Sequence, residues 1–202
     1  MKHRTARIAL GLLVIGMAGA HVATAAGSIA DEVREHWKDT RNTMLTIAGA
    51  VPEDKYDYRP VPEVRSFREM LMHMVEDTAI HIGYAGGASR EESERVTAKH
   101  AKIKTRAEFL KALNESYDYG DKILADLTDQ NALDMVTGMR GAHMTRIAAY
   151  LHALHDIEDH YGNLVVYLRL NGITPPSTAT RQQERQQERG QQPEHGEQQH
   201  RH

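Results

Sequence analysis

Three metal-capable side chains recur at four-residue spacing in the stretch 150–176. His152, Asp156 and His160 lie one helical turn apart, because an α-helix turns by about 100° per residue. Imidazole nitrogens and carboxylate oxygens are ligands of divalent metals in proteins. We therefore expect Asp156 and His160 to reach one ion. His155 is the alternative to Asp156, but on an ideal helix it lies roughly 140° away from His160. A solvated polar helix face is the simpler alternative.

A second polar row precedes this one in the chain. His73 and Asp77 also lie one turn apart, whereas we place His81 in a neighbouring row. A lone histidine beside a helical core is more often hydrogen-bonded than metal-bound, but two polar rows on facing helices favour a shared ion. Neither stretch contains the Glu-x-x-His motif of a ferritin-like di-iron site, so we expect a mononuclear site.

The elements that must position these rows are helices. Apolar residues recur at three- and four-residue spacing in four stretches, which are about 28–49, 66–85, 105–127 and 147–170. The last stretch carries one apolar stripe, which consists of Ile147, Leu151, Leu154, Tyr161, Leu164, Val165 and Leu168. We predict an all-α fold, an antiparallel four-helix bundle with one or two long connections.

The helix ends are marked by residues that favour specific caps. Ser66 with Glu69 and Thr105 with Glu108 form capping boxes. Gly172, followed by two prolines, suits a left-handed C-cap. The segment 88–104 is expected to be a polar loop, and the segment 135–140 is ambiguous.

The first 25 residues have the pattern of a cleaved signal peptide. Lys2, Arg4 and Arg7 precede an uncharged apolar run, and small residues end at Ala25. Cleavage near Ala25/Ala26 predicts a periplasmic or secreted protein without a stable membrane anchor.

Composition restricts the classes of partner and of chemistry. The chain has 25 Lys and Arg against 28 Asp and Glu, and removal of the signal peptide leaves 22 against 28. An acidic domain without a stripe of basic residues is a poor candidate for binding nucleic acid. Cysteine is absent, which excludes disulfides, thiolate ligands and a cysteine nucleophile.

The remaining chain divides into one domain and a tail. Residues 26–176 have the size of a single domain. Residues 177–202 are rich in Gln, Glu, Arg and His, lack large apolar side chains and are expected to be disordered. His195, His200 and His202 in this tail are expected to bind metal only weakly, because binding would have to order the tail.

Three segments of the chain carry a resemblance to a known family. They are VPEDKYDYRPVPEVRSF at 51–67, MLMHMVED at 70–77 and EDHYGNLVVYLRLNGITPP at 158–176. With these segments the chain resembles the DinB family, also called DinB/YfiT-like, of metal-binding four-helix bundles. The resemblance implies three protein ligands and open positions on one divalent metal, such as Zn, Mn, Fe or Ni. His73 matches the first ligand and His160 the third, while Asp156 stands where the family usually has histidine. A carboxylate there favours harder ions over copper.

The resemblance also suggests several functions. Relatives include transferases and isomerases that use the metal to activate a small thiol, although an exported protein would meet little of a cytoplasmic thiol. A metal-dependent hydrolase is an alternative, with Glu76, Asp77 or Glu158 as a base. A non-catalytic metal-binding or structural module is a further alternative. Relatives often associate through helix faces, so a homodimer is also expected.

Overall fold

The computed structural model describes residues 27–100 and 102–191. The signal peptide expected at 1–25 lies outside these residues, as do His195, His200 and His202. Within the described residues, no helix combines the length and the apolar character needed to cross a membrane.

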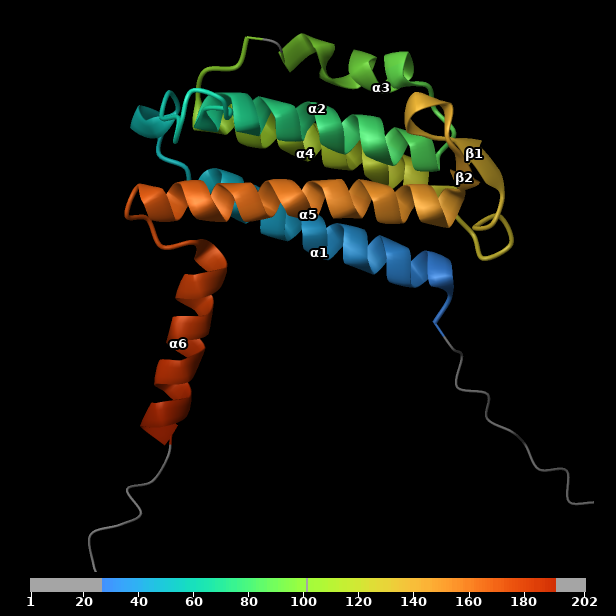
Figure 1. Ribbon diagram of the computed structural model, residues 1–202. Helices are drawn as coiled ribbons and strands as arrows, with labels where there is room; N and C mark the ends of the chain where they lie inside the picture. Colours follow the sequence, from blue (N-terminus) through green and yellow to red (C-terminus); the bar gives the residue numbers. More distant parts are fainter. Residues whose placement is uncertain (1–26, 101, 192–202) are drawn as a thin grey trace, which may run out of the picture.

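Four long helices form a bundle, which confirms the predicted all-α fold (Figure 1). They are α1 (Ile29–Gly49), α2 (Phe67–Ala85), α4 (Arg106–Ala125) and α5 (Arg146–Leu170). Helix α2 packs against α4 and α5, and α1 packs against the same two helices from the other side. Both α2 and α4 begin with the capping boxes predicted at Ser66 and Thr105.

The helix directions are only partly those of an antiparallel bundle. Helices α2 and α5 run antiparallel, but α2 and α4 run parallel (Figure 1). The hydroxyl of Ser116 in α4 donates to the carbonyl of Val75, and further along both helices Ile123 contacts Gly86. The parallel arrangement follows from α3 (Arg90–Thr97) and the 3₁₀ turn η2 (Ala98–His100), which return the chain along the outside of the bundle.

Helix α3 corrects the expectation of a polar loop at 88–104. Ser89 and Glu92 form a third capping box, and only Ser93 and Thr97 are buried against the bundle. The helix was not predicted because its inward residues are small and polar, so the segment has no apolar stripe. Small hydroxyl side chains are enough to pack α3 against the bundle, because α2 approaches α3 closely at Gly83. Ser93 fills the space that a side chain at Gly83 would take.

Two further connections have short regular elements. The segment between α1 and α2 contains the 3₁₀ turn η1 (Glu53–Lys55), after which Tyr56 is buried edge-on against Phe109. Between α4 and α5, β1 (Met135–Thr137) and β2 (His143–Thr145) form an antiparallel hairpin around η3 (Met139–Gly141).

The buried face of α5 differs from the predicted apolar stripe. Leu151 is 56% exposed, whereas Ala149 and Ala153 are buried. The prediction was wrong at Leu151 because it ranked positions by hydrophobicity. Alanines on the inner face let a neighbouring helix approach, and their small size gives a weak sequence signal. The predicted left-handed C-cap is present at Gly172, with φ 71°.

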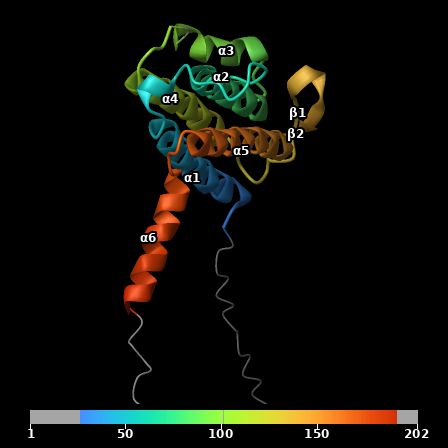
Figure 2. The ribbon, with the colours of Figure 1, turned by 60° about the vertical axis from the view of Figure 1, so that its left-hand side comes forward.

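Helix α6 (Pro176–Gln191) corrects the disorder expected for the start of the 177–202 tail. Proline suits the first position of a helix, and Gln, Glu and Arg all have good helix propensity. The hydroxyl of Tyr161 donates to Oγ of Ser177 at 2.6 Å, which ties the first turn to α5. Beyond this turn the helix extends away from the bundle with exposed side chains (Figure 2).

Two helical glycines give opposite predictions for stability. A Cβ at Gly120 would overlap the buried indole of Trp37, whereas a Cβ at Gly162 meets nothing within 4 Å. We expect Gly120→Ala to destabilise the fold by about 1–3 kcal/mol through overpacking. Gly162→Ala should instead stabilise it by up to about 1 kcal/mol through helix propensity. Thermal unfolding of both variants tests this, and equal effects at the two positions would contradict it.

Candidate metal centre

The interface between α2 and α5 gathers five ionisable side chains, which we call the His/Asp cluster. Three of them are His73, Asp77 and His81, at successive turns of α2. The other two are Asp156 and His160, one turn apart on α5. Because the helices are antiparallel, His73 lies beside His160 and His81 lies beside Asp156.

Asp77 is the centre of the cluster. Its Oδ2 lies 3.0 Å from Nε2 of His73 and 3.3 Å from Nε2 of His160. Oδ2 of Asp156 lies 3.3 Å from the same nitrogen of His160 and 3.6 Å from Nε2 of His81. The cluster is therefore a continuous ladder of nitrogen and oxygen donors across the helix interface.

These donors fit a divalent cation. Donor atoms of His73, Asp77 and His160 lie within 4.8 Å of one another, and those of Asp77, His81 and Asp156 form a second set of this kind. Oδ2 of Asp156 is buried without a hydrogen-bond partner. An anionic oxygen in that position is stabilised by a cation. A mixed imidazole and carboxylate set suits Zn, Mn, Fe or Ni.

The carboxylates and imidazoles of the cluster shift one another's pKa values. Burial disfavours the imidazolium of His160, but Asp156 and Asp77 outweigh it and raise the pKa of His160 to about 9. Burial also opposes ionisation of Asp77, yet its pKa is held well below the usual value by His160 and His73. The neighbouring His160 likewise lowers the pKa of Asp156. In the absence of metal, a proton on His160 compensates the two carboxylates.

The three predicted ligands, His73, Asp156 and His160, all lie in the cluster, but they do not form one compact donor set, because Asp77 rather than Asp156 joins His73 and His160. The structure also adds Asp77, which the sequence had suggested only as a base, and His81, which we had placed in another row. The placement of His81 was wrong. Side chains at i, i+4 and i+8 form a ridge that is only slightly inclined to the helix axis, so all three can contact the same partner helix. The signal was the pattern His-x₃-Asp-x₃-His, which occurs in both α2 and α5.

The remaining candidates lie outside the cluster. Glu76, Glu158 and His155 are exposed on the outer faces of their helices. His152 is exposed as well, but it lines a pocket next to the cluster.

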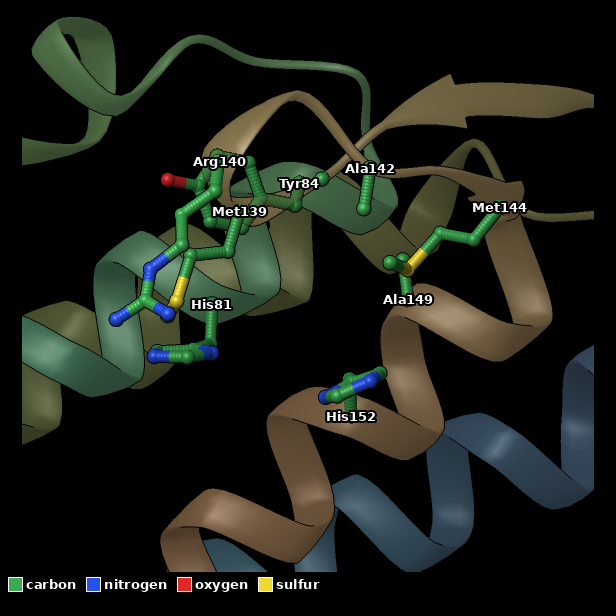
Figure 3. Close-up of a pocket in the computed structure, with 9 residues that line it drawn as sticks. His81, Tyr84, Met139, Arg140, Ala142, Met144, Ala149 and His152 are labelled. Atoms are coloured by element: carbon green, nitrogen blue, oxygen red, sulfur yellow. The ribbon is translucent and has the colours of Figure 1, made fainter.

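That pocket lies between α2, α5 and the hairpin, and it has a volume of about 190 Å³ (Figure 3). Its lining is mostly apolar and includes Tyr84, Met139, Met144, Ala149, His81, His152 and Arg140. His81 belongs to both the pocket and the cluster, so the two share a wall. Arg140, at the turn of the hairpin, adopts a left-handed conformation with φ 55°, which is unfavourable for a side chain of this size.

Comparison with known proteins gives consistent matches. Residues 24–195 match the sequence model of the DinB family. A DinB-like protein from Bacillus subtilis is 22% identical, with a TM-score of 0.57 over 71% of this chain and 93% of that chain. A DinB-like protein from Bacillus cereus is 12% identical, with a TM-score of 0.61 over 74% and 96%.

A third solved structure, of a putative DinB family member from Exiguobacterium sibiricum, is 21% identical. Its TM-score is 0.55 over 71% of this chain and 91% of that chain. At these identities the structures support the fold. The search of curated proteins gave no match.

The raised pKa of His160 predicts how the metal-free protein responds to pH. The folded-state pKa of about 9 exceeds the ordinary value of 6.5. The resulting stabilisation is fully present below pH 6.5 and is lost as the pH rises through about 9. We expect a loss on the order of 1–3 kcal/mol, measured by unfolding in the presence of a chelator.

A matched pair of variants isolates this effect. His160→Gln should remove the pH dependence, whereas His155→Ala, on the exposed face of the same helix, should retain it. If wild type and His160→Gln lose the same stability between these pH values, the assignment to His160 is wrong.

Proposed function

The chain belongs to the DinB family, and on this premise we propose that it is an exported protein that binds a divalent metal between α2 and α5. His73, Asp77 and His160 would hold the ion, with Asp156 next to it. The metal, when bound, supplies a Lewis acid with open positions. The protein would use it in transferase-like chemistry on a small thiol.

The partly buried His/Asp cluster is the observation that supports metal binding. Two carboxylates and two imidazoles direct donor atoms at one region of the α2–α5 interface. Desolvated carboxylates are costly unless a cation compensates them. The exposed histidines elsewhere on α5 lack such an arrangement.

The shared wall between the cluster and the pocket supports a small-molecule ligand. The apolar lining suits a short aliphatic or thioether group, and the guanidinium of Arg140 would pair with a carboxylate of a bound thiol. His81 and His152 provide imidazole nitrogens beside the pocket, where they could accept the proton of the thiol. Glu76 and Glu158 do not line the pocket, so they are not placed to contribute in this way.

A structural metal is the second candidate function. It is favoured by the position of the cluster, which joins two helices that are distant in sequence. An ion held by both helices would stabilise the bundle without any reaction.

Cobalt(II) binding to the full chain tests the proposal. Wild type and His155→Ala should develop the visible absorption of protein-bound cobalt at matched concentrations. His160→Ala should lose most of this signal, because the variant lacks the imidazole that α5 contributes to the proposed site. Equal signals from His160→Ala and His155→Ala would place the metal elsewhere.

The same samples separate the two candidate functions. Addition of a small carboxylate-containing thiol should produce a sulfur-to-cobalt charge-transfer band if the ion retains an open position. A purely structural ion would instead raise the melting temperature strongly and leave the spectrum unchanged.

Export rests on the signal-peptide pattern of residues 1–25. We expect the mature protein to begin near Ala26, and intact-mass measurement of protein from its natural host checks this. A mass that includes residues 1–25 would contradict export by cleavage.

A further inference from the structure

We propose that the His/Asp cluster binds two divalent cations at adjacent positions, with Asp77 contributing to both. This inference rests on the proposed metal-binding function and extends it. The first position is the set of His73, Asp77 and His160. The second is the set of Asp77, His81 and Asp156.

One ion cannot use all five side chains. Zinc and similar ions bind nitrogen and oxygen at about 2.0–2.2 Å, so two donors on one ion lie at most about 4.4 Å apart. His73 and His81 are eight residues apart on α2, which corresponds to about 12 Å along the helix axis. Within the described residues, neither compact donor set contains both histidines. The ladder is thus long enough for two positions but too long for one.

His81 indicates that the second position is built for a ligand. Its side chain is only 9% exposed, and the nearest carboxylate oxygen, on Asp156, is 3.6 Å from Nε2. That distance is longer than a hydrogen bond. Within the described part of the chain, the His81 ring forms no hydrogen bond. The ring faces the ladder beside Oδ2 of Asp156, a buried oxygen without a hydrogen-bond partner.

An ion at the first position would not be bound by these two groups. His81 belongs only to the second set, and Oδ2 of Asp156 lies between His160 and His81. A cation bound by His81 and Asp156 would satisfy both with the donors that they already present.

The two positions differ in chemistry. The first offers two imidazoles and one carboxylate, which suits zinc or nickel. The second offers one imidazole and two carboxylates, which suits a harder cation such as manganese or ferrous iron. Two divalent ions also exceed the charge of the two carboxylates, so the pair would attract an anionic ligand. The adjoining pocket, lined by His81 from α2 and His152 from α5, provides a place for that ligand (Figure 3).

Manganese(II) loading of the full chain tests the proposal by metal analysis and electron paramagnetic resonance. Wild type and the exposed-histidine control His155→Ala should each retain one ion more per chain than His81→Ala. Histidines elsewhere in the chain are common to these proteins, so the difference isolates the second position. Wild type should show a spin-coupled spectrum, because neighbouring manganese ions share a carboxylate. His81→Ala should show the six-line spectrum of an isolated ion.

The buried position of His81 calls for a second variant. His81→Gln preserves size and polarity, and its helix content can be checked by circular dichroism. It should lose the same ion. Equal metal content in both His81 variants and His155→Ala, with an uncoupled wild-type spectrum, would overturn the second position and leave the mononuclear site intact. Failure of every protein to retain manganese, zinc or nickel would overturn the proposed function as well.

Discussion

Two partly buried carboxylates between α2 and α5 are the constraint on which the rest of the structure depends. Asp77 and Asp156 face each other across the most extensively packed helix pair, where water cannot fully solvate them. Their charge has to be compensated locally. A proton on His160 does so in the metal-free protein, and a divalent ion would replace it. Protonation, the proposed metal binding and the docking of α5 would therefore be linked at one place.

The surrounding fold keeps this interface in register. The capping box at Ser66 fixes the start of α2, seven residues before His73. The return of the chain through α3 leaves one flank of α2 free for α5, while α4 occupies the other. The hairpin between α4 and α5 then closes the end of the interface and forms the pocket. The hairpin thus borders the pocket, and the regular helices hold the cluster.

Much of this arrangement could be predicted from the sequence, because strong local signals agree with the fold. The capping boxes at Ser66 and Thr105 and the glycine C-cap at Gly172 are short-range features, and they are present. His73, Asp156 and His160 could be selected as candidate ligands from spacing and family resemblance, and all three lie in the cluster. The part played by Asp77 and His81 depends on which side of α2 faces α5, and that is a tertiary property. The exposure of Leu151 could not be predicted for the same reason. The contact face of α5 is defined there by small alanines and not by large apolar residues. The polar helices α3 and α6 were missed because neither carries an apolar stripe.

The most direct test of this account is an anomalous-scattering map from crystals of the protein grown with zinc and measured at the zinc absorption edge. The account predicts a strong peak between α2 and α5, within coordination distance of Asp77 and of nitrogens from His73 and His160. Peaks confined to exposed histidines such as His155, with none at the α2–α5 interface, would contradict it.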